Sequence, residues 1–591
     1  MTSDQDPPRP EDVQATFCAT LVDEWVRAGV RHAVVAPGSR STPMALALAA
    51  DDRLRLHVHL DERSAAFVAL GIGKATRAPA VALTTSGTAA VELHPAVVEA
   101  DLAGVPLLAV TADRPPELQH VGAPQTVDQA HLFGRSVRWF VDPGVADAAA
   151  AHTWRSLGAR AVAEATTGPA GPGPVQLNLP FREPLVGKPG PLPAGRPDGA
   201  PWHTTEGRRL AVDRWGTERL AGLLDADRGV IVAGAGAGDP EVVHALSDAT
   251  GWPVLADPLS GCRAPSAGTV GAFDAILRHD PTAAALVPDV VLRLGEPPAS
   301  KVLARWLAGS GAVQVVVHAS GRWYDADRTA SHVLHASPTA VAQALLRLVG
   351  ARGAGAAAWR ARWAGAEAAA AGAIAASIAA EPSCTGPGIA ASVASAAPEG
   401  ATLVVSSSMP VRDLEWHATP RTGLRVLSNR GANGIDGVVS TATGVALAAA
   451  DASPTDASPT IALLGDLALL HDAGALVGAA RRGIDLVLVV VDNDGGAIFS
   501  FLPQAAALSP ERFELLFGTP QGVDLAALAA AHGIGVVEVA SPDAVGPAVV
   551  EACAAGGVHL VRARTERTGV VAVQDRVVAA VAAALEALAP G

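Results

Sequence analysis

Cysteine and lysine are scarce in this chain of 591 residues, and no apolar run is long enough to cross a bilayer. The four cysteines lie far apart and form neither a C-x-x-C metal pair nor a dense disulfide framework, which predicts a reduced, cytoplasmic setting. The longest apolar tract, residues 368–380, is mostly alanine and too short for a membrane span. The polar, proline-rich start does not have the pattern of a secretory signal. We therefore expect a cytoplasmic protein without membrane insertion.

The charge balance limits the partners as well. The formal net charge is −14, which argues against nucleic acid or an anionic membrane as the ligand. Only three lysines are present, Lys74, Lys188 and Lys301. Anionic small substrates are still compatible with this balance, because a local group of arginines can oppose the global charge.

Helical and strand patterns alternate along the chain, which predicts doubly wound parallel sheets with ligands at the carboxyl ends of the strands. The length suggests three or four domains. Proline- and glycine-rich stretches near residues 186–208 and 381–387 mark two boundaries. We predict an α/β fold of three such domains, at residues 11–185, 208–380 and 383–588.

The pattern also places the individual elements. The expected strands are residues 32–36, 55–60, 81–85, 106–112, 229–233, 253–255, 290–294, 313–318, 402–405, 424–427, 461–464, 486–491 and 558–561. Helices are expected at residues 14–28, 42–50, 63–76, 89–102, 351–380 and 469–482. The glycine-rich stretch 234–238 comes after a strand but lacks the G-x-G-x-x-G spacing of a dinucleotide site, so a tight turn is the better interpretation.

A strand, helix and strand unit at residues 460–496 predicts a metal site. Its two apolar strands should be neighbours in a buried parallel sheet. Asp466 comes directly after the first strand and Asn493 after the second, so their side-chain oxygens can reach one cation. Mg²⁺ prefers oxygen ligands and leaves positions for substrate phosphates, and Gly495 can leave a backbone carbonyl free as a further ligand. We therefore predict a magnesium diphosphate site; two ordinary turns are the alternative.

The same unit resembles the diphosphate-binding motif of the thiamine diphosphate (ThDP) enzymes. GDLALLHD and the later DNDGGAIFSFLP are similar to the 2-succinyl-5-enolpyruvyl-6-hydroxy-3-cyclohexene-1-carboxylate (SEPHCHC) synthases of menaquinone biosynthesis. Further stretches match that family in order, namely APGSRSTP (36–43), DER (61–63), TTSGTA (84–89), TADRPPEL (111–118) and GAPQ (122–125). Pro124 departs from the expected asparagine, and Asp492 and Asp494 make the metal turn more acidic than in some relatives, which leaves substrate contacts and the choice of Mg²⁺ or Mn²⁺ open.

The resemblance implies pyrimidine-binding, central and diphosphate-binding domains of the ThDP-enzyme type. It implies that Glu62 is the catalytic acid, hydrogen-bonded to N1′ of the cofactor pyrimidine. Ile435 is implied as the bulky residue that holds the bent cofactor, and plain core packing is its alternative. The implied cofactor-binding residues are Glu62, Gly434, Ile435, Asp466, Asn493 and Gly495, of which the last three also bind the metal.

The family decarboxylates 2-oxoglutarate and adds the resulting succinyl carbanion equivalent to isochorismate. Several cations around one site would suit two dicarboxylate substrates. The resemblance implies substrate contacts at Ser39, Arg40, Arg114, Gln125, Lys301, Ser408, Arg412, Arg430, Ile498, Phe499 and Leu502. For Lys301 a surface lysine at a helix start is the alternative. Because Glu62 and the metal ligands lie in different domains, the resemblance also implies a homodimer or homotetramer with sites at the subunit interface.

Other functions stay open on the sequence alone. A simple 2-oxoglutarate decarboxylase or an acetohydroxyacid synthase would use the same cofactor site. A catalytically silent ligand-binding or scaffold protein would keep the fold, although intact Glu62, Asp466 and Asn493 count against it. The sequence does not decide between dimer and tetramer, which cation meets which carboxylate, or whether pathway products inhibit the enzyme.

Overall fold

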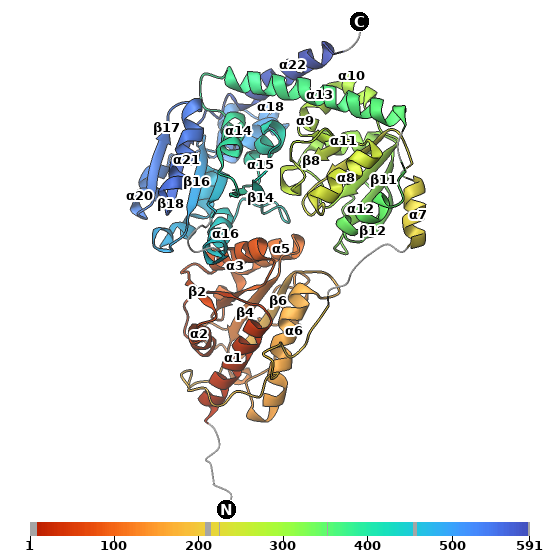
Figure 1. Ribbon diagram of the computed structural model, residues 1–591. Coiled ribbons are helices and arrows are strands. Elements are labelled where there is room, and N and C mark those ends of the chain that lie inside the picture. Colours follow the sequence, from red (N-terminus) through yellow and green to blue (C-terminus); the bar gives the residue numbers. More distant parts are fainter. Residues whose placement is uncertain (1–8, 207–213, 224, 351–352, 453–457, 589–591) are drawn as a thin grey trace, which may run out of the picture. The chain divides into compact units, whose positions relative to one another are not determined.

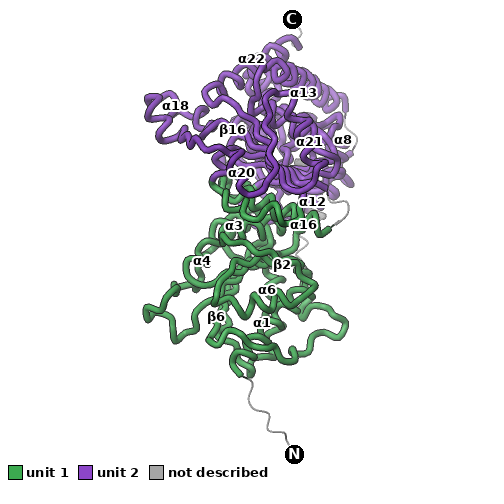
Figure 2. Tube along the Cα trace, turned by 90° about the vertical axis from the view of Figure 1, so that its left-hand side faces the viewer, with its two compact units in different colours: residues 1–208, 429–457, 471–484 green, residues 209–428, 458–470, 485–591 purple. Residues whose placement is uncertain are grey.

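Three six-stranded parallel sheets form the protein, as a computed structural model shows (Figure 1). The structure describes residues 9–206, 214–223, 225–350, 353–452 and 458–588. These divide into two compact units, coloured separately in Figure 2. Unit 1 comprises residues 1–208, 429–457 and 471–484, and unit 2 comprises residues 209–428, 458–470 and 485–591. Among the described residues no helix combines the length and apolarity of a membrane span.

The first sheet belongs to unit 1 and has the strand order β2-β1-β3-β4-β6-β5. Its strands are β1 (His32–Val35), β2 (Arg55–Val58), β3 (Ala80–Thr84), β4 (Leu107–Asp113), β5 (Trp139–Val141) and β6 (Pro174–Pro180). Its helices are α1 (Pro10–Arg27), α2 (Thr42–Ala49), α3 (Glu62–Thr76), α4 (Thr88–Val91), α5 (His94–Leu102) and α6 (Trp154–Thr166). The central strands are buried along their length, as expected for strands covered by helices on both faces.

Helix α16 (Val438–Ala452) also belongs to unit 1, where it packs on α3. The two helices cross at glycines. A Cβ on Gly71 of α3 would lie 2.1 Å from the carbonyl oxygen of Thr441, and a Cβ on Gly444 of α16 would lie 2.1 Å from that of Val68. Only glycine permits so close an approach of two backbones.

The second sheet lies in unit 2 and has the order β12-β11-β10-β7-β8-β9. Its strands are β7 (Gly229–Ala233), β8 (Val254–Ala256), β9 (Thr269–Val270), β10 (Val290–Leu294), β11 (Val313–His318) and β12 (Ala330–His335). The helices of this part are α7 (Arg214–Leu223), α8 (Pro240–Thr250), α9 (Phe273–Leu277), α10 (Asp280–Ala285), α11 (Lys301–Gly309), α12 (Pro338–Leu346) and α13 (Ala354–Ala379). The predicted long helix at 351–380 is confirmed as α13, with residues 351–352 outside the described residues. Trp359 of α13 donates its indole N–H to the carbonyl of Gly229 at the start of β7 (2.8 Å), so this helix packs against the second sheet.

The third sheet, also in unit 2, has the order β14-β13-β15-β16-β18-β17. Its strands are β13 (Thr402–Val405), β14 (Arg425–Leu427), β15 (Thr460–Gly465), β16 (Leu486–Asp492), β17 (Gly535–Val539) and β18 (Val558–Arg564). The helices are α14 (Gly386–Ala396), α15 (Met409–His417), α17 (Asp466–His471), α18 (Gln504–Ala507), α19 (Pro510–Phe513), α20 (Leu525–Ala531), α21 (Val545–Ala555) and α22 (Val570–Glu586). Helix α14 packs against α15 and α21, and α22 packs against α13 (Figure 1).

The predicted fold class, three doubly wound α/β domains, is confirmed, and one sheet lies within each predicted domain range. The boundaries themselves stay a prediction.

Two helix predictions are wrong. Residues 469–482 do not form one helix: α17 ends at His471, and 3₁₀ turns come next at Ala473–Leu476 and Ala479–Arg481. Gly478, with φ of 73°, separates the turns. The predicted helix at 89–102 is split into α4 and α5, because Pro95 in the first turn of α5 has no N–H to continue a helix.

Five strands are missing from the sequence prediction, namely β5, β6, β9, β12 and β17. Four of them lie at sheet edges. Strands β5, β12 and β17 are only partly buried, so they lack the continuous apolar run of a central strand. Strand β6 is fully buried, but Gln176 and Asn178 interrupt its apolar pattern.

Candidate active site

The predicted metal ligands lie at the carboxyl ends of β15 and β16 in unit 2. These strands pair in parallel along their length, as predicted. The Asp466 carboxylate accepts hydrogen bonds from the backbone amides of Leu467 (2.6 Å), Asn493 (3.0 Å) and Gly495 (2.9 Å). Burial raises the pKa of Asp466, while these amides act in the opposite direction. The contacts hold the turn at residues 493–495 against the end of the neighbouring strand.

The donor set of this turn fits a hard cation. Asn493 Oδ1 is buried and has no hydrogen-bond partner among the described residues. A buried amide oxygen without a partner is costly unless it receives a ligand. Gly495 has a φ of 146°, and a Cβ there would lie 2.1 Å from the carbonyl oxygen of Gly518, so the turn requires glycine. Carboxylate, amide and backbone oxygens are the ligands that Mg²⁺ accepts.

The acidic neighbours of Asn493 are engaged within the protein. Asp492 accepts a hydrogen bond from Arg562 Nε (2.7 Å) in a buried ion pair. Asp494 accepts hydrogen bonds from the backbone amides of Gln521 (2.8 Å) and Gly522 (2.9 Å). The acidity of the turn therefore serves local structure, and Asp466 is the carboxylate that accepts from the backbone amide of Asn493.

A cavity of about 670 Å³ lies beside the same turn, within unit 2. Met409, Asp413, Asn493 and Phe501 are among the residues that line it. Small-molecule sites typically measure roughly 300–1,000 Å³. Burial raises the pKa of Asp413 to about 8, so this carboxyl group is mostly neutral at pH 7.

Two predicted substrate residues of unit 2, Ser408 and Arg412, lie at the start of α15. Ser408, which precedes this helix, has a φ of 74°, unusual for a residue other than glycine. Arg412 Nη1 donates a hydrogen bond to the Ser408 carbonyl (2.5 Å). Ile498, Phe499 and Leu502 are each partly exposed, which suits an apolar wall.

Lys301 is exposed at the first position of α11, directly after the loop that leaves β10. No local sequence pattern indicates how this loop is held. The buried Glu415 of α15 accepts hydrogen bonds from the backbone amides of Ala299 (2.8 Å) and Ser300 (3.3 Å). The Glu415 carboxyl group, beside the third sheet, thus holds the loop that precedes Lys301, beside the second sheet.

Arg40 and Arg114 lie at the carboxyl edge of the first sheet in unit 1. Arg40 is 7% exposed and donates to the Phe181 carbonyl (3.0 Å) and to Glu183 Oε1 (3.0 Å). Its buried Nε has no partner among the described residues. Desolvation and the charge of Arg40 both lower the pKa of Arg114, whereas Asp113 and Glu183 act in the opposite direction. Ser39, in the same loop, is partly exposed.

Gln125 lies at the same edge. Arg114 donates to the hydroxyl of Ser86, and Ser86 Oγ donates to the Gln125 carbonyl (3.1 Å). Gln125 Nε2 donates to the Ser86 carbonyl (3.2 Å), and Gln125 has a φ of 57°. The structure therefore brings Arg40, Arg114 and Gln125 together. Pro124 precedes Gln125 without a side-chain polar group.

Glu62 begins α3, one residue after the N-cap Asp61, whose side chain accepts from Ser64 N (3.0 Å). Within the described part of the chain no group pairs with the Glu62 carboxylate. The start of α3 is held by the segment at the end of α17: Arg63 donates to the carbonyl of His471 (2.8 Å), and Ser64 Oγ contacts Asp472 (3.4 Å). The Glu62 carboxylate can therefore bind a ligand, and the helix start that carries it is held in place.

Asp472 is a residue that the sequence interpretation missed, although it ends the quoted GDLALLHD motif. It is fully buried and accepts hydrogen bonds from Ser440 N (2.7 Å) and Ser440 Oγ (2.9 Å). Burial raises its pKa to about 6. Asp472 thereby connects the starts of α3 and α16.

The loop at residues 428–437 carries Arg430, Gly434 and Ile435, and all three are partly exposed. Partial exposure favours the cofactor-support role of Ile435 over plain core packing. Altogether unit 1 holds Ser39, Arg40, Glu62, Arg114, Gln125, Arg430, Gly434 and Ile435, and unit 2 holds Lys301, Ser408, Arg412, Asp466, Asn493, Gly495, Ile498, Phe499 and Leu502.

Three family models match the chain. They are the N-terminal TPP binding domain of thiamine pyrophosphate enzymes at residues 16–132, the middle domain of thiamine pyrophosphate enzymes at 199–404, and their C-terminal TPP binding domain at 413–563. Thiamine pyrophosphate is the same compound as ThDP. The fold and the site therefore define a ThDP enzyme, and the predicted cofactor is confirmed.

Similar proteins narrow the family. Proteins named 2-succinyl-5-enolpyruvyl-6-hydroxy-3-cyclohexene-1-carboxylate synthase occur in Myxococcus xanthus, 45% identical over 97% of this chain and 98% of the relative, and in Thermobifida fusca, 43% identical over 96% and 98%. The Chloroflexus aurantiacus protein of the same name is 43% identical over 93% of each chain. The chain belongs to this SEPHCHC synthase family, which confirms the predicted family and the class of ThDP-dependent transferase.

Proposed function

We propose that the protein joins 2-oxoglutarate to isochorismate with loss of CO₂, giving SEPHCHC in menaquinone biosynthesis. The observation that carries the proposal is the buried Asn493 Oδ1, which has no partner among the described residues, in a turn whose backbone amides donate to the Asp466 carboxylate; such an oxygen suits a cation ligand. The substrates are those of the family, whose members are named for this product.

The residues of this chain have distinct roles in the proposed reaction. ThDP, when bound, supplies the carbanion chemistry. Asp466, Asn493 and the Gly495 carbonyl would hold Mg²⁺, or Mn²⁺, against its diphosphate, and Gly434 and Ile435 would support its bent form. Glu62 would hold a proton at N1′ of the pyrimidine, a contribution of roughly 10²–10⁴-fold for positioned proton transfer.

The cationic and polar side chains would bind the two dicarboxylates. We assign this role to Ser39, Arg40, Arg114, Gln125, Lys301, Ser408, Arg412 and Arg430, with Ile498, Phe499 and Leu502 as the apolar wall. Arg40 and Arg114 support the assignment, because both follow strands of the first sheet at its carboxyl edge and guanidinium groups pair with carboxylates, as Arg40 does with Glu183. Fixed orientation of both substrates lowers the barrier to carbon–carbon bond formation.

We further propose a homodimer or homotetramer in which two copies complete each site. The family resemblance supports this assembly, together with the distribution of the candidate residues over two units. A cytoplasmic location is also proposed, supported by the four cysteines, none of which forms a disulfide and three of which are buried.

The experiment is a coupled assay of the purified protein with ThDP, Mg²⁺ and 2-oxoglutarate, with and without isochorismate, in which substrate loss and product mass are measured. Consumption of both substrates to one adduct is the expected result. Decarboxylation that leaves isochorismate untouched would move the function to a simple 2-oxoglutarate decarboxylase. Bound flavin and acetohydroxyacid products would indicate an acetohydroxyacid synthase, and no turnover of any 2-oxoacid a scaffold.

A further inference from the structure

Lys74 of α3 and Glu99 of α5 form a buried ion pair in unit 1. Lys74 Nζ lies 3.0 Å from Glu99 Oε1, and the side chains are 7% and 3% exposed. Burial of two charges costs free energy unless further hydrogen bonds satisfy them. Lysine is scarce in this chain, so its placement in a core is unexpected.

The further hydrogen bonds of Glu99 come from a candidate site loop. The backbone amide of Gly431 donates to Glu99 Oε1 (3.1 Å), and that of Ala432 donates to Oε2 (2.7 Å). Both amides belong to the 428–437 loop and lie 332 and 333 residues from Glu99 in sequence. Hydrogen bonds to a charged carboxylate are roughly twice as strong as neutral ones.

Packing holds the same loop at both ends. A Cβ on Gly431 would lie 2.8 Å from the backbone nitrogen of Ala103, just after α5. Gly437 has a φ of 64°, and a Cβ there would lie 2.1 Å from the ring of Phe67 in α3. The backbone of the loop therefore lies close against α5 at Gly431 and against α3 at Gly437.

We propose that Glu99, neutralised by Lys74, is a positioning residue that sets the 428–437 loop for catalysis. Arg430 directly precedes the two bonded amides, and Ile435 lies three residues after them. The inference rests on the proposed function in so far as Arg430 contacts substrate and Ile435 supports ThDP. Glu99 touches neither ligand; it acts through the backbone of the loop.

The charge on Glu99 is essential to this role. A glutamine at this position keeps one acceptor oxygen but turns an N–H₂ group toward a backbone amide or the lysine, which are themselves donors. It also takes the charge of Glu99 away from the buried Lys74 ammonium. Glu99→Gln should therefore loosen the loop and destabilise the fold, and the experiment must separate the two effects.

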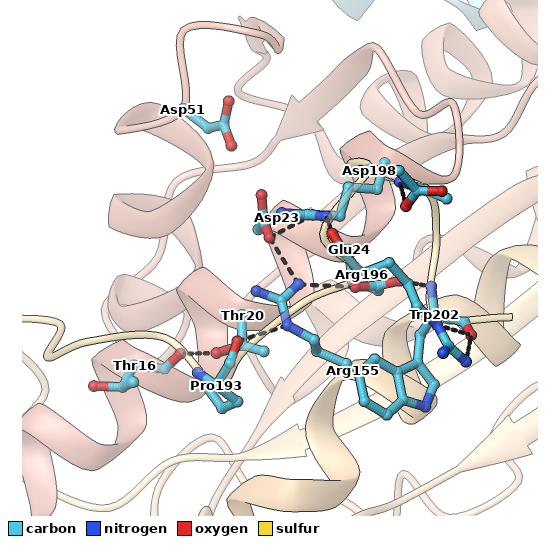
Figure 3. Close-up of polar contacts among 12 residues, drawn as sticks. Thr16, Thr20, Asp23, Glu24, Asp51, Arg155, Pro193, Arg196, Asp198 and Trp202 are labelled. Atoms are coloured by element: carbon cyan, nitrogen blue, oxygen red, sulfur yellow. Dashed lines mark hydrogen bonds and ion pairs between the residues drawn. The ribbon is translucent and has the colours of Figure 1, made fainter.

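A matched control exists in the same unit. Arg155 of α6 donates to Asp23 (2.7 Å) and Glu24 (2.9 Å) of α1, and Glu24 also accepts from the Trp202 backbone amide (Figure 3). Arg155 and Glu24 are as deeply buried as the Lys74 pair, with side chains 5% and 1% exposed. Arg155 also donates to the Pro193 carbonyl (2.7 Å), so this network holds the chain after β6 and contacts no candidate site residue.

The experiment compares Glu99→Gln, Lys74→Met/Glu99→Gln and Glu24→Gln in the full-length protein with ThDP and Mg²⁺. The readouts are melting temperature, Kd for ThDP, KM and kcat for 2-oxoglutarate, and hydrogen exchange of peptides covering 428–437. Glu99→Gln should exchange faster in this loop and raise both the Kd and the KM roughly tenfold, the loss of one charged hydrogen bond. Glu24→Gln should lower the melting temperature and leave the loop and both constants unchanged.

The double variant keeps the proposal open to refutation if the single variant folds poorly. Lys74→Met removes the buried charge that Glu99 balanced, so the melting temperature should recover while the raised Kd, raised KM and fast loop exchange persist. The positioning role would be overturned if the double variant recovered the melting temperature, the Kd, the KM and the slow loop exchange together. It would also be overturned if the loop exchanged at the same rate in Glu99→Gln as in Glu24→Gln. Absence of turnover in the unsubstituted protein would refute the proposed function alone, because ThDP affinity and loop exchange still report on Glu99.

Discussion

The first and third sheets have the same strand order and opposite chemistry at their carboxyl edges. In both, the order by sequence within the domain is second, first, third, fourth, sixth, fifth. The edge of the first sheet presents Arg40 and Arg114, whose charges act on one another. The edge of the third presents the acceptor oxygens of Asp466 and Asn493. Function in this protein is therefore set by the loops after the strands, and not by the sheet.

The largest effect on turnover is expected for Glu62→Gln, because we assign the chemical step to this residue of unit 1. The variant should keep its fold and its affinity for ThDP and Mg²⁺ but lose turnover by roughly 10²–10⁴-fold, because glutamine cannot hold the proton at N1′. Steady-state rates at saturating cofactor measure the effect. Glu92→Gln, an exposed glutamate of the same unit, is the control. Near-normal turnover of Glu62→Gln would refute its catalytic role.

The matching change in the third sheet is Asp466→Asn, in the part assigned to cofactor binding. Loss of the negative charge should raise the Mg²⁺ concentration needed for half-maximal ThDP binding by about 10–100-fold, since a hydrogen-bonded charge is worth about 1.5–3 kcal/mol. Titration of ThDP binding with Mg²⁺ measures it. Asp492→Asn is the control, because Asp492 pairs with Arg562; it should lower stability and change the Mg²⁺ dependence less than Asp466→Asn does. The reverse pattern would contradict the proposed ligand set.

Much of the difference between the two sheet edges could be predicted from the sequence, because it depends on the residues directly after each apolar run. Strands β7, β10, β11 and β13 match their predicted bounds, since short runs of buried β-branched and leucine residues end sharply at turns. Asp466 and Asn493 could be paired from the parallel crossover rule alone. The crossover helix could not be predicted as broken, because its end depends on the buried contact of Asp472 with Ser440.

Contacts distant in sequence were beyond prediction for a physical reason. A buried carboxylate such as Glu99 has the same local pattern as a solvated one on a helix surface, and only folding reveals the amides that it accepts from. The same holds for Glu415, whose partners precede it by 116 and 115 residues. Local periodicity identifies the elements and their ends, whereas long-range polar contacts require the tertiary structure.

A smaller effect is expected for Arg114→Gln at the edge of the first sheet. If Arg114 binds a substrate carboxylate, the KM for 2-oxoglutarate or isochorismate should rise roughly tenfold while ThDP affinity is unchanged. Arg182→Gln is the control, because Arg182 forms an exposed ion pair with Glu117 on the same unit. An equal KM in both variants would remove Arg114 from the substrate site.

The smallest effect concerns the two buried glutamates that hold candidate loops, Glu99 in unit 1 and Glu415 in unit 2. Glu99 has a lysine as its partner, whereas Glu415 lies beside Asp257 and Asp274, with Arg263 as the nearby cation. Burial, with these carboxylates, raises the pKa of Glu415 well above its usual range, and Arg263 acts in the opposite direction. Burial and the two carboxylates therefore favour the neutral form of Glu415.

This difference predicts opposite responses to glutamine. Because the pKa of Glu415 is raised in the folded protein, folding favours its protonated form, so stability falls as the pH rises above the usual glutamate pKa of about 4.3. Glu415→Gln has no such proton to lose. Its melting temperature should therefore rise relative to that of the unsubstituted protein when the pH is changed from about 5 to about 8. Glu99→Gln removes the charge that balances Lys74 at both pH values, so its deficit in melting temperature should persist. Thermal melts at the two pH values measure both, and a constant offset for Glu415→Gln would show that Glu415 is charged when it holds the loop of Lys301.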